Sequence, residues 1–108
     1  MNPERGEVWL ADLGMVAKTR PVVIVSRNDD NPPRALAIYI PLTTQYRNSP
    51  YEIPLPNLRF LRQTSFANVQ GIGSIPLVRL EYCLGQLPDI VMIKIDAALR
   101  FTLDLEDL

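Results

Sequence analysis

Hydrophobic residues recur along this chain in short runs that are separated by turn-forming residues. Most runs contain β-branched or aromatic residues and either alternate with polar positions or are continuously apolar, which is typical of β-strands. The pattern predicts strands over 7–13, 21–26, 35–44, 51–55, 64–70 and 79–87. Only the last apolar stretch of the chain has a different period.

Two of the predicted strands carry features that restrict where they lie. The run PVVIVS, residues 21–26, is continuously apolar after its proline, so we expect a strand that is buried on both faces. Pro21 fits only at the first position of that strand or on an edge, because proline cannot donate a ladder hydrogen bond. Pro41 falls inside the strand predicted over 35–44 and requires a bulge, a bend or an edge position there.

The segments between these strands differ in character. The sequence RNDDNPPR, residues 27–34, has the composition of a loop. We expect a turn of helix over NLRFLRQ, residues 57–63. The glycines of GIGSIP, residues 71–76, predict an interruption between the two last strands.

The C-terminal stretch DIVMIKIDAALRFTLDL, residues 89–105, predicts one helix that follows Pro88, a residue tolerated at a helix start. Its expected core stripe has helical spacing and consists of Met92, Ile95, Ala98, Leu99 and Thr102. Further apolar residues lie outside the stripe, namely Ile90, Val91, Ile93 and Phe101. One face of a helix cannot bury this many apolar residues, so the additional ones suggest a surface that binds a partner. The alternative is a helix that is deeply buried in its own domain.

Five or six short strands followed by one helix predict a mainly β fold. Closing or curling the sheet hides the edges of so many short strands, so we expect a small, strongly bent sheet or a partly open barrel. The chain has 108 residues, of which 47% are hydrophobic and 21% charged, which suits a single globular domain over 1–108.

Composition narrows the chemistry further. The chain contains no histidine, and its single Cys83 cannot form an internal disulfide, so we expect no metal or other cofactor. No apolar run is long enough to span a bilayer, and the sequence MNPERGE lacks the layout of a secretion signal. These features predict a cytoplasmic protein.

The net charge of −1 is the average of two unlike regions. Residues 1–80 contain nine Lys or Arg against six Asp or Glu, whereas residues 81–108 contain two against six. The excess of basic residues therefore lies in the N-terminal 80 residues. Solvated surface faces explain such a small surplus as well as an anionic partner does.

The stretch KTRPVVIVS, residues 18–26, places a basic pair directly before a buried strand. Arg20 precedes a rigid proline, so its backbone is fixed, and a guanidinium held in this way can bind a phosphate with two hydrogen bonds. A solvated loop is the ordinary alternative for such a pair. Thr43 ends the strand predicted over 35–44, and we expect it beside Arg20 if the two strands are neighbours.

Other candidate chemistry is weaker. The segment QGIGS, residues 70–74, lacks the Lys-Ser/Thr tail of a phosphate-binding P-loop, so a tight turn is the simpler interpretation. The carboxylate pairs Glu7 with Asp12 and Asp29 with Asp30 show no spacing that favours acid–base chemistry over capping. Cys83 has no basic neighbour in sequence and is expected to be a small buried hydrophobe.

The order of these motifs resembles the MazF/PemK family of toxins from type II toxin–antitoxin systems. The resemblance rests on RGEVWLADLG, KTRPVVIVS, IPLTT, SFANVQ and RLEYCLGQL, followed by the helix with IDAALRFTL. It covers Arg5 to about Leu103, and its most specific parts are RGEVW, TRPVVIVS and the threonine after Pro-Leu.

The resemblance implies an SH3-like barrel that forms a homodimer, cleaves single-stranded RNA without a metal and is neutralised by a cognate antitoxin. The family's cleavage residues fall on Arg20 and Thr43 in this chain. Further candidates for RNA contacts are Lys18, Thr19, Thr44, Tyr46, Arg47 and Gln70, with Tyr46 as a stacking surface.

Two alternatives remain open at this point. One is a barrel that binds RNA or a protein and has lost catalysis, which predicts saturable binding without cleavage products. The other is a gyrase poison of the CcdB kind, which shares the barrel. That family depends on a tryptophan near its C-terminus, whereas this chain ends in LDLEDL and contains only Trp9.

Overall fold

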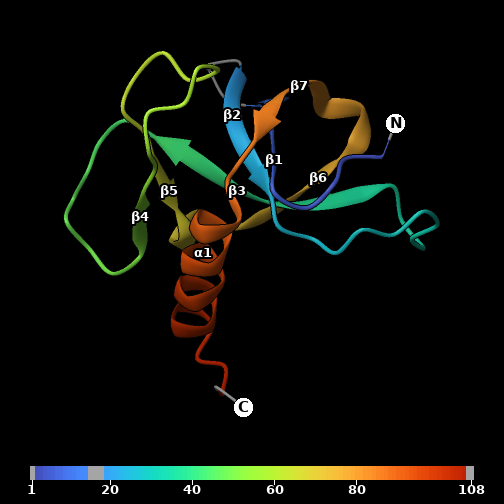
Figure 1. The fold of residues 1–108 in the computed structure, drawn as a ribbon. Helices are drawn as coiled ribbons and strands as arrows, with labels where there is room; N and C mark the ends of the chain where they lie inside the picture. Colours follow the sequence, from blue (N-terminus) through green and yellow to red (C-terminus); the bar gives the residue numbers. More distant parts are fainter. Residues whose placement is uncertain (1, 15–18, 107–108) are drawn as a thin grey trace.

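The computed structural model describes residues 2–14 and 19–106. Within these residues, seven strands form one antiparallel sheet in the order β4-β5-β3-β2-β1-β7, and β6 pairs with β3 beside that path (Figure 1). The strands are β1 (Glu7–Asp12), β2 (Thr19–Ile24), β3 (Leu36–Thr43), β4 (Glu52–Pro54), β5 (Phe66–Asn68), β6 (Gly73–Pro76) and β7 (Leu80–Gln86). The sheet does not close between β4 and β7 among the described residues, which confirms a partly open barrel.

β3 is the central strand, and its neighbour on one side changes along its length. Its first half, Leu36 to Tyr39, pairs with β6, and its last two residues, Leu42 and Thr43, pair with β5. Pro41 lies between these two ladders and faces Val22 of β2 on the other side. A proline is tolerated there because the partner of β3 changes from β6 to β5 at this point, so no ladder hydrogen bond from Pro41 is needed on that side.

Two hydrophobic clusters pack against the curved sheet. The helix-side core includes Val23, Ile40 and Ile95, and the second core includes Trp9, Val22 and Ile24. Successive residues of β2 therefore enter opposite clusters, because side chains alternate across a strand. This confirms that the apolar run of residues 22–24 is buried on both faces.

The helix α1 (Asp89–Thr102) packs against β4 and against η1 (Val69–Gly71), a short 3₁₀ helix (Figure 1). Its buried residues are Val91, Met92, Ile95 and Ala98. Val91 therefore belongs to the core and not to the predicted surplus, whereas Ile90, Ile93 and Phe101 are exposed. The helix ends three residues before the predicted limit, and Asp104 then turns the chain with a positive φ of 55°.

Two segments between the strands differ from the predictions. Residues 57–63 form turns and bends and contain no helix. The chain does not break over 71–76, because Gly73–Pro76 is the strand β6. A Cβ on Gly71 would lie 2.8 Å from Cγ of Pro41, so this glycine lets the chain pass close to β3.

The loop over 57–63 instead covers the open side of the sheet. A Cβ on Gly85 of β7 would lie 2.4 Å from the ring of Phe60, so this ring packs directly on the backbone of β7. Phe60 also packs against the helix-side core. The loop between β4 and β5 thus reaches the strand at the other end of the sheet.

Cys83 is exposed on β7, so the prediction of a buried thiol is wrong. β7 pairs with β1 and lies at one end of the strand order, where a short apolar side chain is not enclosed. Partial burial and the nearby Glu7 carboxylate raise the pKa of the Cys83 thiol.

Within the part of the chain that the structure describes, no helix has both the length and the apolar character that crossing a bilayer requires.

The buried face of α1 provides a test of this packing. Ile95 is fully buried, whereas Val78, which lies outside the helix, is 89% exposed. We expect Ile95→Ala to lower the free energy of unfolding by about 2–5 kcal/mol, because it removes buried apolar contacts and leaves a cavity. Val78→Ala is the control, with an expected change within about 0.5 kcal/mol. Urea unfolding of both variants measures the difference, and equal stabilities would contradict this placement of the helix.

Candidate active site

Arg20 and Thr43 lie next to each other at the ends of two neighbouring strands. The β2–β3 pairs end with Val22 and Pro41, and the same register continued by two residues places Arg20 opposite Thr43, in agreement with the hollow that both residues line. Directly opposed residues of antiparallel strands project on the same face of the sheet. The expected adjacency of these two residues is therefore present in the structure.

Both residues line one polar hollow of about 430 Å³. Its lining consists of Arg20, Pro21, Leu42, Thr43, Thr44, Gln45 and Ser65. Among the described residues, no carboxylate lies within ion-pair distance of the Arg20 guanidinium. The exposed cation is thus available to an anion that enters the hollow.

The hydroxyl of Thr43 is oriented by its own loop. The backbone N–H of Gln45 donates a hydrogen bond of 3.1 Å to Thr43 Oγ1. A hydroxyl has one proton to donate in addition to its acceptor lone pairs, so the Thr43 proton remains available to a bound anion. Ser65 differs, because its Oγ already donates a 2.9 Å hydrogen bond to the carbonyl oxygen of Gln63.

The loop after Thr43 is held in place by a buried carboxylate. Glu52 is only 9% exposed, and its Oε1 accepts a hydrogen bond of 2.9 Å from the backbone N–H of Arg47. Asn48 adopts a positive φ of 52°, which turns the chain back towards β4. These features fix the course of the loop that carries Thr44 and Arg47.

The aromatic residues Tyr46 and Phe66 each follow a lining residue in sequence, although neither is itself part of the lining of the hollow. The ring of Tyr46 stacks on that of Phe66 with a centroid distance of 4.4 Å and an interplanar angle of 6°. Phe66 is the register partner of Thr43, so it lies on the next strand beside that residue. The Tyr46 hydroxyl is 3.1 Å from Oδ1 of Asn48 and donates a hydrogen bond to it.

The remaining predicted contacts are distributed differently. Thr44 lines the hollow, whereas Thr19, at the start of β2, and Gln70, in η1, are not among its lining residues. Arg47 is exposed on the loop between β3 and β4. Lys18 lies outside the described residues.

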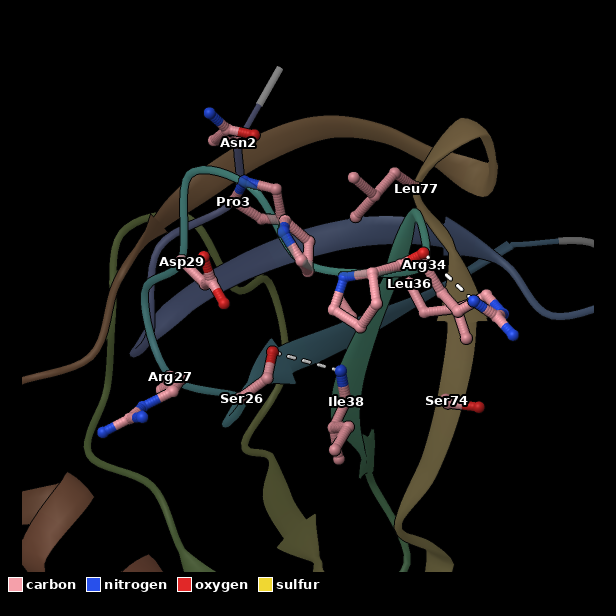
Figure 2. Close-up of a pocket in the computed structure, with 13 residues that line it drawn as sticks. Asn2, Pro3, Ser26, Arg27, Asp29, Arg34, Leu36, Ile38, Ser74 and Leu77 are labelled. Atoms are coloured by element: carbon pink, nitrogen blue, oxygen red, sulfur yellow. Dashed lines mark hydrogen bonds between the residues drawn. The ribbon is translucent and has the colours of Figure 1, made fainter.

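A second hollow, of about 310 Å³, lies at the other end of β2 and β3 (Figure 2). Apolar residues such as Leu36, Ile38 and Leu77 contribute to its wall, and the Arg27 side chain points away from it in Figure 2. Ser26 Oγ accepts a hydrogen bond of 3.1 Å from the backbone N–H of Ile38 there. Arg27, Arg34, Ser26 and Ser74 also line this hollow, but its wall is mainly apolar, whereas the wall of the hollow at Arg20 and Thr43 is mainly polar. No group of three or more potential metal ligands occurs among the described residues.

Comparisons with known proteins identify the family to which the chain belongs. Residues 4–103 match the family model described as PemK-like, MazF-like toxin of type II toxin–antitoxin system. The chain belongs to this toxin family. The probable endoribonuclease MazF5 of Mycobacterium tuberculosis (strain H37Rv) is 34% identical over 103 residues, which cover 94% of each chain.

Solved structures of PemK/MazF-like toxins share the fold. A mycobacterial endoribonuclease in complex with its cognate antitoxin is 31% identical, with a TM-score of 0.86, and the match covers 98% of this chain and 99% of that one. The Mycobacterium tuberculosis toxin MazF-mt6 is 26% identical, with a TM-score of 0.83 over 94% of this chain and 99% of that one. The predicted family and its SH3-like barrel are thus confirmed.

Two residues of this PemK/MazF-like toxin that line the hollow, Gln45 and Ser65, were not predicted from the sequence. Gln45 directly follows the two threonines, and its backbone N–H orients Thr43. This backbone role carries no side-chain signal in the sequence. Ser65 precedes β5 and reaches the hollow only because β5 pairs with the end of β3, which is a long-range contact.

The buried Glu52 carboxylate gives a testable prediction about the loop. We expect Glu52→Ala to raise the hydrogen-exchange rate of the Arg47 amide by about tenfold or more, because that amide loses a charge-assisted hydrogen bond. Hydrogen exchange followed by NMR measures this rate. The exposed Glu81 of β7 provides the control variant Glu81→Ala, which should leave the Arg47 amide unchanged. An unchanged rate in Glu52→Ala would contradict the assigned role of Glu52.

Proposed function

We propose that this PemK/MazF-like toxin cleaves single-stranded RNA without a metal ion, with the scissile phosphate between Arg20 and Thr43. The observation that carries the proposal is the polar hollow where these two residues meet. A phosphate needs a cation and hydrogen-bond donors, and the hollow provides a guanidinium and an oriented hydroxyl. The named endoribonucleases among the relatives support the same activity.

The chemistry needs no water nucleophile. The 2′-hydroxyl oxygen of the RNA attacks the adjacent phosphorus, and the bond from phosphorus to the 5′-oxygen breaks. The products are a 2′,3′-cyclic phosphate and a 5′-hydroxyl end, with one proton leaving the 2′-oxygen and one reaching the 5′-oxygen. The protein therefore has to align the attack and stabilise the charge that develops on the phosphoryl oxygens.

The two proposed catalytic residues have separate tasks in this reaction. Arg20 stabilises the developing negative charge, because its guanidinium stays protonated and presents several N–H donors. The Thr43 hydroxyl donates a hydrogen bond to a phosphoryl oxygen, because its oxygen accepts from the Gln45 N–H and its proton remains free to donate. Thr44 and Gln45 complete the wall beside the phosphate. We propose Lys18, Thr19, Arg47 and Gln70 as further contacts along the RNA.

The proposal includes partners and location. A cognate antitoxin binds and neutralises this toxin, and the related mycobacterial endoribonuclease in complex with its cognate antitoxin supports such a partner. The toxin acts in the cytoplasm as a single domain over 1–108 and forms a homodimer. Exposed apolar side chains such as Ile90, Ile93 and Phe101 on α1 support an association surface.

Two other functions compete with RNA cleavage. A binding module without catalysis would retain the hollow and bind RNA without producing new ends. A gyrase poison of the CcdB kind is disfavoured, since the matched family is PemK-like and MazF-like. An RNA cleavage assay separates the binding module from the proposed enzyme.

We predict that Arg20→Ala lowers the rate of RNA cleavage by about 10²–10³-fold, by analogy with the loss of one transition-state charge stabiliser. The assay incubates the purified toxin with a long single-stranded RNA in EDTA and maps every new 5′ end. The wild type should give discrete cuts with 5′-hydroxyl ends.

The matched control is Arg34→Ala, which removes an exposed arginine at the other hollow. It should leave cleavage unchanged. Cutting by Arg20→Ala at the wild-type rate would overturn the site assignment. Saturable binding of RNA by the folded wild type, without any cut on several RNAs, would favour the binding module.

A further inference from the structure

The aromatic pair beside the hollow has one uncovered face. Tyr46 remains 46% exposed although Phe66 covers one face of its ring at 4.4 Å in a nearly parallel arrangement. Phe66 itself is partly buried. Because Phe66 covers one ring face, the exposed surface of Tyr46 is confined to the opposite ring face, the ring edge and the backbone.

This surface follows directly from the residues that line the hollow. The pair of Thr43 with Phe66, and the β2–β3 register continued from Val22 and Pro41, place Arg20, Thr43 and Phe66 in one row across β2, β3 and β5. Adjacent strands lie about 4.8 Å apart, so the row spans roughly 10 Å from the cation to the aromatic pair. The two lining residues Gln45 and Ser65 each precede one member of the pair in sequence. A nucleotide with its phosphate in the hollow thus has its base within reach of the rings.

The pair is also held in its orientation before any ligand binds. Phe66 supports the Tyr46 ring from one side, and the ring's hydroxyl donates a hydrogen bond to Asn48. The loop backbone is fixed by the hydrogen bond from the Arg47 amide to Glu52. A ring that is already ordered loses little conformational entropy when a base stacks on it.

We propose that the exposed face of Tyr46, supported by Phe66, is a stacking platform for the nucleobase next to the scissile phosphate. This inference rests on the proposed ribonuclease function and assigns its aromatic subsite. Base stacking on an aromatic ring tolerates different bases, because every base has a flat π-face. The platform therefore positions the strand and favours the larger purine rings, and it adds no hydrogen-bond readout of its own.

The test combines a missing base with a missing ring. Cuts are first mapped on a long RNA with the wild type, and short RNAs are then made with an abasic nucleotide at each position that flanks one cut. In single-turnover assays, one abasic position should lower wild-type cleavage by about 5- to 150-fold, the loss of one base–aromatic stack. In Tyr46→Ala, the same abasic position should have no further effect. A purely structural role of the ring does not produce this coupling.

Two variants complete the design. Tyr46→Phe keeps the ring and should retain the abasic effect, although it loses the hydrogen bond to Asn48. Tyr82→Ala removes another exposed tyrosine, 55% exposed on β7, and should behave as the wild type. An abasic penalty of equal size in Tyr46→Ala and wild type would overturn the platform while leaving the ribonuclease proposal intact. A folded wild type that cuts no RNA would overturn the ribonuclease proposal itself.

If no RNA is cut, the platform still has an independent readout. A single-stranded DNA oligonucleotide with one 2-aminopurine carries no 2′-hydroxyl at any position and so remains intact. Its fluorescence should fall on binding to the wild type, because stacking quenches the base, and should fall less with Tyr46→Ala. Equal quenching by both proteins would overturn the platform.

Discussion

The site depends on the change of partner along β3 at Pro41. The first half of this strand pairs with β6, and its end pairs with β5, while β2 runs along the other side. Because proline cannot donate a ladder hydrogen bond, it occupies the point between the two ladders. Gly71 packs against Pro41 closely enough to exclude any larger side chain without a shift. The end of β3 is thereby directed towards β2 and β5 together.

This arrangement brings the chemical groups of three strands into one row. Arg20 supplies charge, Thr43 supplies an oriented hydroxyl, and Phe66 supports the ring of Tyr46. A buried carboxylate, Glu52, fixes the loop that continues from β3. A reaction that uses the nucleophile of its own substrate requires mainly this kind of alignment and charge stabilisation. The fold thus provides the parts that the proposed RNA cleavage needs.

The sequence predicted what depends on local pattern and missed what depends on distant contacts. The apolar run 22–24 identified a doubly buried strand, and the spacing of Met92, Ile95 and Ala98 identified the helix face. The strand β6 was missed because glycines usually mark turns, whereas here they permit close packing against β3. Arg20 and Thr43 were singled out by their places at the ends of predicted strands, and the family resemblance gave them a role in cleavage, but only the strand pairing and the shared hollow showed that they meet. The contribution of Ser65 to the hollow likewise depends on strand pairing that no local pattern reveals.

Arg20 and Thr43 are proposed to act on the same phosphate. A double-mutant cycle with Arg20→Ala, Thr43→Ala and the double variant, measured in single-turnover RNA cleavage, tests this shared role. Groups that act together on one transition state are not additive, so the double variant should lose clearly less activity than the product of the two single losses. Thr43→Ser keeps the hydroxyl and should retain most of the activity. Losses that multiply fully, or a Thr43→Ala variant as active as the wild type, would contradict a shared phosphate site.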